Sequence, residues 1–192
     1  MSESKGAVAP MKSGDPEVIS YLKNTIRNIQ DFPRPGVVYR DITPLLSDAR
    51  AFRGAVDMLA EFCRSKSPTC IVGIESRGFI LGAPVAAALN LGFAPVRKAG
   101  KLPFDTVSQS YQLEYGSDTV EMHRDVLTAS DRVVVVDELL ATGGTAYATC
   151  LLVEKLGAKV EAVAALVDLA FLPWREKLEG YEVKTLVSYD TE

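Results

Sequence analysis

The apolar residues of this chain follow two patterns, short continuous runs and longer stretches with helical spacing. Runs that are wholly or mostly apolar occur at residues 70–74, 93–97, 133–136 and 160–169. A run without apolar–polar alternation is typical of a strand that is buried on both faces of a parallel sheet. Helical spacing fills the stretches between these runs. The alternation of strands with helices predicts an α/β fold with a central parallel sheet flanked by helices.

Several local signals set the expected limits of the other elements. Asp15, Pro16 and Glu17 predict a helix start, because they supply a capping side chain, a proline and an acid in the first turn. Apolar spacing continues that helix to Ile29, before prolines break it. The polar stretch at residues 104–110 predicts a long flexible loop. The other expected elements are helices at about residues 48–64, 79–90, 146–156 and 173–178 and strands at about residues 37–42, 110–116 and 182–189.

The composition is that of one globular domain, with 192 residues, 47% of them hydrophobic and 24% charged. We expect this domain over residues 15–192, after a mobile tail over residues 1–14. The net charge of −4 disfavours a nucleic-acid partner. The tail has no apolar core for a secretory signal, and Pro84, Asn90 and Gly92 interrupt the one long apolar stretch, so no membrane span is expected. These features predict a cytoplasmic protein with reduced, buried cysteines.

The candidate chemistry centres on residues 133–146, which read VVVVDELLATGGTA. Asp137 and Glu138 follow the valines, and a glycine–threonine loop then leads into a helix. Glycines let backbone N–H groups turn toward an anion, and a helix N-terminus favours negative charge. Carboxylates beside such a cradle suit the hydroxyls of a sugar phosphate. The structural alternative is a strand-to-helix turn whose glycines only permit tight packing.

Two other loops follow strands of the same expected sheet. Glu75, Ser76 and Arg77 come after residues 70–74, and a basic cluster that includes Lys98 and Lys101 comes after the next strand. The carboxyl ends of parallel strands meet at one edge of a sheet, where ligands bind. The three motifs are therefore expected in one crevice, with room for a second anion. A solvated basic turn is the alternative for the lysine cluster.

Residues 133–145 closely resemble the signature with which type I phosphoribosyltransferases bind phosphoribosyl pyrophosphate (PRPP), and they lack the lysine of a Walker A loop. Four segments, FPRPGVVYRDITPLL, IESRGFILG, RKAGKLP and SYQLEYG, are similar to the members of this family that act on adenine. The resemblance implies an N-terminal base-binding hood and a flexible catalytic loop. It also implies that the chain converts adenine and PRPP to AMP and pyrophosphate, with Mg²⁺ carried by PRPP.

The same resemblance assigns roles to individual residues. The 5′-phosphate would be bound by Ala141, Thr142, Gly143, Gly144 and Thr145. Asp137 and Glu138 would hold the ribose hydroxyls, directly or through Mg²⁺-bound water, and no dedicated protein ligand for the metal is expected. Pyrophosphate would be bound by Glu75, Ser76, Arg77, Arg97, Lys98 and Lys101. Two positions depart from the family pattern, Glu138 from an aspartate and Ala99 from an arginine found in some members.

For the base, the resemblance assigns Val38 and Arg40 to the ring edge of adenine and Tyr39 and Leu140 to its faces. Glu114 would be the general acid or base that handles the purine proton. Core packing for Tyr39 and an exposed carboxylate for Glu114 are the alternatives, and His123 is expected on the solvated surface. The resemblance also implies a homodimer. Two other functions stay open, a 6-oxopurine phosphoribosyltransferase and a non-catalytic regulator that senses PRPP.

Overall fold

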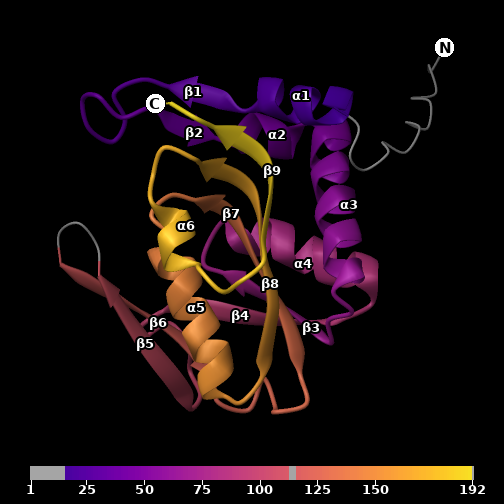
Figure 1. Ribbon diagram of the computed structural model, residues 1–192, viewed down its shortest axis with the longest axis vertical. Coiled ribbons are helices and arrows are strands. Elements are labelled where there is room, and N and C mark those ends of the chain that lie inside the picture. Colours follow the sequence, from indigo (N-terminus) through magenta and orange to yellow (C-terminus); the bar gives the residue numbers. More distant parts are fainter. Residues whose placement is uncertain (1–15, 113–115, 192) are drawn as a thin grey trace. The chain divides into compact units, whose positions relative to one another are not determined.

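The computed structural model describes residues 16–112 and 116–191 (Figure 1). Its contacts divide the chain into two compact units, Met1–Met58 and Leu59–Glu192. The single domain expected over residues 15–192 stays a prediction. Helix α3 (Ala49–Ser65) crosses the division between the two units.

The N-terminal unit begins with helix α1 (Pro16–Thr25), strand β1 (Arg27–Ile29), strand β2 (Tyr39–Asp41) and helix α2 (Thr43–Ser47). The prediction that the first helix continues to Ile29 is wrong. The helix ends at Thr25, whose hydroxyl donates to the carbonyl of Tyr21 at 2.8 Å. Residues 27–29 instead pair antiparallel with β2. Pairing with a segment distant in sequence has overridden the helical spacing.

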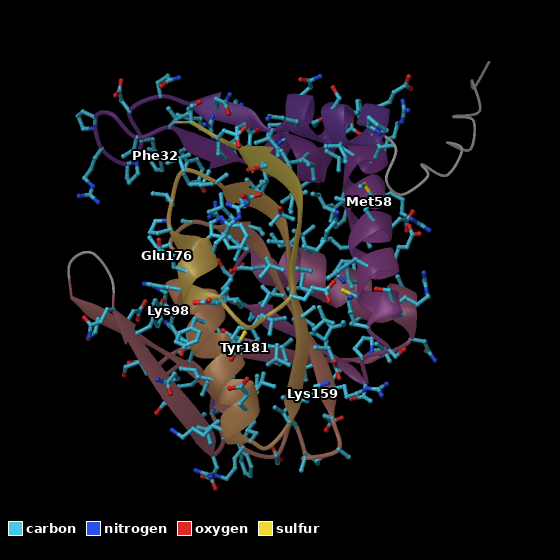
Figure 2. All side chains as sticks on the ribbon, viewed as in Figure 1. Phe32, Met58, Lys98, Lys159, Glu176 and Tyr181 are labelled. Carbon is cyan, nitrogen blue, oxygen red and sulfur yellow. The ribbon has the colours of Figure 1, made fainter. Side chains whose placement is uncertain are left out.

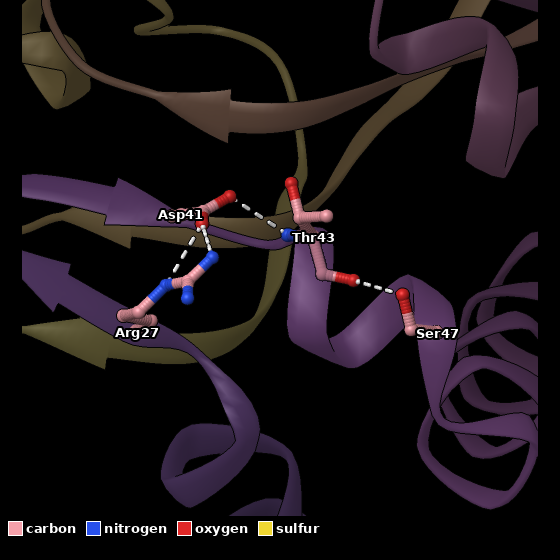
Figure 3. Close-up of polar contacts among 4 residues, drawn as sticks. All are labelled: Arg27, Asp41, Thr43 and Ser47. Carbon is pink, nitrogen blue, oxygen red and sulfur yellow. Dashed lines mark hydrogen bonds and ion pairs between the residues drawn. The ribbon is translucent and has the colours of Figure 1, made fainter.

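A carboxylate holds the end of this β1–β2 ribbon (Figure 3). Asp41 Oδ2 accepts hydrogen bonds from Arg27 Nε at 3.1 Å and Nη2 at 2.7 Å, and Asp41 Oδ1 accepts one from the Thr43 amide at 2.9 Å. Bonds from Thr43 and Arg27 lower the pKa of Asp41 to about 2. One side chain therefore joins β1, β2 and the first turn of α2.

The C-terminal unit contains a seven-stranded sheet in the order β5-β6-β4-β3-β7-β8-β9 within the described residues. Its strands are β3 (Cys70–Ile74), β4 (Gly92–Lys98), β5 (Thr106–Gln112), β6 (Ser117–His123), β7 (Arg132–Leu140), β8 (Lys159–Leu169) and β9 (Val183–Tyr189). Its other helices are α4 (Gly78–Leu89), α5 (Gly144–Lys155) and α6 (Trp174–Lys177). The five strands from β4 to β9 are parallel neighbours, so the expected α/β class is confirmed.

The order of the parallel strands changes direction between β3 and β7. From β3 the chain crosses through α4 to β4 on one side, and from β7 it crosses through α5 to β8 on the other. Right-handed crossovers in opposite directions place the two helices on opposite faces of the sheet, as Figure 1 shows. The carboxyl ends of β3 and β7 thus flank a topological switch point, where α/β sheets bind ligands.

Strand β7 lies in the core of the sheet and is largely buried. Its four valines at residues 133–136 are each 0% exposed, as predicted for a strand covered on both faces. The cysteines are free and buried, and burial raises the pKa of the Cys63 and Cys150 thiols to about 12. They are therefore protonated at neutral pH and poorly reactive. Among the described residues, no helix combines the length and the apolar character needed to cross a membrane.

Two predictions for the region after β4 are wrong. Most of the loop expected at residues 104–110 is strand β5, which pairs antiparallel with β6 from Thr106 to Gln112. The polar residues of this ribbon face solvent, which weakens its apolar pattern. His123 is half-buried rather than solvated, and its ring stands edge-on to Phe104, 6.1 Å between centroids.

Asp41→Asn should lower the free energy of unfolding at pH 7 by about 1 kcal/mol, after allowance for the exposed Arg27 partner. The folded-state pKa lies below the unfolded value, so the stabilisation is fully present above the unfolded pKa near 4. It is lost as pH falls through about 2. Urea unfolding at several pH values measures the difference between variant and wild type.

The control is Asp57→Asn, which removes an exposed pair with Arg53 and should have little effect. A difference between Asp41→Asn and wild type that stays constant down to pH 2 would contradict the assignment.

Candidate functional site

The glycine–threonine loop lies at the carboxyl end of β7, where it begins α5. Gly143 has φ +76° and is the N-cap of that helix, a left-handed conformation that favours glycine. Residues 141–145, with Asp137 and Leu139, line an open pocket. The first N–H groups of α5 have no partner within the helix, and the helix dipole places partial positive charge there. The loop therefore has the construction of a phosphate site, although α5 begins at Gly144 rather than at the expected Ala146.

Asp137 and Glu138 lie within β7, which continues beyond them to Leu140. Both are largely buried, each with 8% of its surface exposed. Asp137 Oδ1 accepts a hydrogen bond from the Glu138 amide at 2.8 Å. Burial raises the pKa of Asp137 well above its usual range, and the neighbouring Glu138 carboxylate raises it further. A buried acid of this kind is suited to hydrogen bonding with the hydroxyls of a bound sugar.

Arg77 connects this acid pair to the other side of the switch point. It is the N-cap residue of α4, and its Nη2 lies 2.6 Å from Glu138 Oε1. The Glu138 side chain is 11% exposed and that of Arg77 is 36% exposed. The guanidinium is thus placed beside the carboxylates while part of it still faces solvent. Two motifs that the sequence predicted for one crevice are in direct contact.

Gly78 permits the close approach of α4 to β7. A β-carbon on Gly78 would lie 2.8 Å from Asp137 Oδ1 and 3.1 Å from the Val136 carbonyl oxygen. Real β-carbons essentially never come within 3.0 Å of another atom, so a larger residue here would require the Asp137 side chain or the neighbouring backbone to shift. Gly78 stands in the ESRG motif, but the sequence alone gave no reason to count it among the site residues.

Glu75 is held by the basic segment that follows β4. Its Oε1 accepts from Arg97 Nη2 at 2.9 Å and its Oε2 accepts from the Lys98 amide, also at 2.9 Å. The Arg97 bond lowers the pKa of Glu75. Arg97 Nη1 also donates to the Lys101 carbonyl at 3.0 Å. Arg97 therefore fixes the β3 turn, where the Glu75–Ser76 peptide bond is cis, against the turn after β4.

Lys98 is paired with a residue that the sequence did not single out. Its Nζ lies 3.1 Å from Asp118 Oδ2 on β6, and this contact raises the pKa of Lys98. The Tyr111 hydroxyl of β5 donates to the same carboxylate oxygen at 3.3 Å. The β5–β6 ribbon therefore reaches the crevice through Tyr111 and Asp118. Tyr111 stands in the SYQLEYG segment, whereas Asp118 lies outside every motif that the sequence analysis quoted.

The candidate base-binding residues are only partly described. Val38, Tyr39 and Arg40 belong to the N-terminal unit, where Tyr39 stands edge-on to Phe32 with 5.2 Å between ring centroids. Glu114 lies outside the described residues. Their assigned roles stay predictions.

Leu140 lines the pocket, although its side chain packs in the core with 1% exposure. Its neighbour Leu139 is half-exposed and lines the same pocket. Alternation along β7 explains the difference in exposure, because neighbouring residues of a strand point to opposite faces. The assignment of Leu140 to a face of adenine stays a prediction.

The fold and this edge site define an α/β protein with a phosphate loop, a carboxylate pair and a second cationic region at one switch point. A family model described as "Phosphoribosyl transferase domain" matches residues 45–187. The chain therefore belongs to the phosphoribosyl transferase family, as its motifs predicted.

Three relatives from that family are each named adenine phosphoribosyltransferase. An adenine phosphoribosyltransferase of Desulfitobacterium hafniense is 56% identical over 85% of this chain and 95% of its own length. The crystal structure of the enzyme of that name from Thermoanaerobacter pseudethanolicus has a TM-score of 0.87 and 47% identity, covering 89% of this chain and 99% of its own. The crystal structure of adenine phosphoribosyltransferase from Saccharomyces cerevisiae, complexed with an imino-altritol bisphosphate and adenine, has a TM-score of 0.83 and 36% identity. The match covers 89% of this chain and 99% of the yeast chain.

Gly78→Ala should lower the free energy of unfolding by about 1–3 kcal/mol, because the added methyl group forces α4 away from Asp137. Alanine is otherwise the better helix former, so a loss of stability reports the contact. Chemical denaturation measures the change. Gly92→Ala is the matched control, since its β-carbon would meet only Cys70 Sγ at 3.9 Å. Equal stability of Gly78→Ala and wild type would contradict the close approach.

Proposed function

We propose that this chain transfers the 5-phosphoribosyl group from PRPP to adenine, giving AMP and pyrophosphate in purine salvage. The observation that carries the proposal is the meeting of the phosphate loop, the Asp137–Glu138 pair and Arg77 at one switch point. A sugar that carries phosphate at one end and pyrophosphate at the other needs such a site. The relatives named adenine phosphoribosyltransferase support the choice of base.

The ribose phosphate would lie along the end of β7. Amides of residues 141–145 would bind the 5′-phosphate, because N–H groups at a helix N-terminus complement a dianion. Asp137 and Glu138 would accept hydrogen bonds from the ribose hydroxyls. Ribosyl transfer passes through a sugar with cationic character, and nearby carboxylates stabilise that charge more strongly than the neutral ground state.

The pyrophosphate would lie on the α4 side of the switch point. Arg77 has several N–H donors, so it can bind an incoming anion while one of them stays near Glu138. Lys98 and Lys101 would add positive charge, and Arg97 would act mainly by holding the Glu75–Ser76 turn in place. Neutralising the charge of the departing pyrophosphate favours breakage of its bond to ribose.

Mg²⁺ would arrive with PRPP rather than occupy a cluster of protein ligands. The Asp137–Glu138 pair offers the oxygen donors that Mg²⁺ prefers. Within the described residues, no group of three or more histidines, cysteines or acids could hold a metal ion. The two acids would therefore contact the ion through water or share it with the substrate. Bound Mg²⁺ would offset the negative charge of the pyrophosphate.

Val38 and Arg40 would contact the edge of adenine, and Tyr39 and Leu140 would pack on its faces. Glu114 would take or share the purine proton as the bond to ribose forms. We further propose a cytoplasmic homodimer without a nucleic-acid or membrane partner, on the strength of the family resemblance and the net charge of −4.

Incubation of the purified protein with Mg²⁺, PRPP and one purine at a time should give AMP from adenine and little product from hypoxanthine, guanine or xanthine. Chromatographic separation of the nucleotides measures each product. Product from hypoxanthine but not from adenine would replace the substrate by a 6-oxopurine. No product from any base, with PRPP still bound, would favour a PRPP-sensing regulator.

Glu114→Gln should lower kcat with saturating PRPP and adenine by about 100-fold, because the amide cannot exchange the purine proton. Steady-state kinetics measures the change, and circular dichroism checks the fold. Glu161→Gln, at the amino end of β8 where Glu161 pairs with Lys159, is the control and should keep the wild-type rate. An unchanged kcat in folded Glu114→Gln would remove Glu114 from the mechanism.

A further inference from the structure

Helix α6 packs directly against the glycine–threonine loop at residues 141–145. A β-carbon on Gly143 would lie 3.1 Å from the Trp174 carbonyl oxygen and 3.2 Å from Trp174 Cα. Trp174 itself is 5% exposed and belongs to the core that includes Ala146 and Leu178. The first residue of α6 is thus packed against Gly143, the N-cap residue of α5. The position of α6 relative to the phosphate loop is fixed by this contact.

A second set of contacts holds α6 from the sheet side. The Arg175 guanidinium carbon lies 4.2 Å from the centre of the Trp174 ring, and Arg175 Nη2 lies 3.5 Å from Asp168 Oδ2. Asp168 is 0% exposed and accepts a hydrogen bond from the Thr185 hydroxyl at 2.7 Å. The guanidinium of Arg175 therefore contacts Asp168 of β8 and the Trp174 ring. The remaining cation of this short helix is Lys177.

Lys177 places its ammonium group beside the first residue of α5. Its Nζ lies 3.7 Å from the position that a β-carbon on Gly144 would take. The side chain is exposed, and no carboxylate in the described part of the chain pairs with it. Among the described residues Lys177 thus has no carboxylate partner, and its ammonium group lies near Gly144, one of the residues that line the pocket.

The place of this cation is electrostatically unfavourable when no ligand is bound. The N-terminus of a helix carries partial positive charge, and lysine is favoured at the opposite end. A bound phosphate dianion reverses the sign, because both the helix amides and the ammonium group then face negative charge. A lysine at this position of α6 is therefore better explained by a bound phosphate than by the empty site.

We propose that Lys177 binds the 5′-phosphate of the substrate and product, together with the amides of the loop. The inference rests on the proposed function and adds to it a residue outside the PRPP signature. Lys177 binds the anion without taking part in bond making or breaking. It acts at the ribose-phosphate end of the site, whereas Arg77 lies beside Glu138.

The test compares Lys177→Met with wild type by calorimetric titration of two probes, ribose 5-phosphate and pyrophosphate. The dissociation constant of ribose 5-phosphate should rise about tenfold, equivalent to about 1.4 kcal/mol, and that of pyrophosphate should not change. In kinetics the KM for PRPP should rise while the KM for adenine stays at its wild-type value. Lys177→Arg keeps the charge and should bind ribose 5-phosphate nearly as wild type does.

Lys159→Met is the matched control, because Lys159 stands at the amino end of β8, far from α6 and its Glu176 in Figure 2. Unchanged binding of ribose 5-phosphate by folded Lys177→Met would overturn the proposal. Equal weakening by Lys159→Met would also overturn it, since the effect would then be one of net charge. Weakened ribose 5-phosphate binding in Lys177→Met with no transfer to any purine by wild type would support Lys177 and refute the proposed function.

Discussion

The burial of two acids at the end of β7 is the constraint on which the rest of the site depends. Removing a carboxylate from water is costly unless it is hydrogen-bonded, paired or protonated. Asp137 meets this cost by accepting a backbone hydrogen bond and by a raised pKa, and Glu138 meets it through Arg77. The Arg77 contact ties the start of α4 to β7. The two halves of the switch point are therefore held together by the groups that would bind substrate.

This constraint also accounts for the packing around the site. Helix α4 must come close enough for Arg77 to reach Glu138, and Gly78 leaves the space for that approach. On the other face, Trp174 packs on Gly143 and fixes the start of α5. The carboxylate of Glu138, which is one methylene longer than aspartate, lies 2.6 Å from Arg77 Nη2. A departure from the family pattern thus coincides with an ion pair in this structure.

Much of the fold could be predicted because burial on both faces leaves a strong sequence pattern. The valines of β7 and the apolar run of β8 show it. Strand β1 could not be predicted, because its three exposed residues owe their conformation to pairing with β2. The β5–β6 ribbon was missed for a related reason, since its polar residues face solvent.

The site was predictable where chemistry is local in sequence. The loop at residues 141–145 and the acids beside it form one segment, and the structure places them together. Lys98 contacts Asp118, and Gly78 contacts Asp137. Each contact joins segments that are distant in the sequence, so no local sequence pattern could predict it. Leu139 and Leu140 both line the pocket, and they differ in exposure because they point to opposite faces of β7.

The most direct measurement of the central claim is a crystal structure of this protein with AMP. In that structure the phosphate should accept hydrogen bonds from amides of residues 141–145, and the ribose hydroxyls should lie beside Asp137 and Glu138. A phosphate bound elsewhere, with the loop empty and the two acids away from the ribose, would contradict this claim.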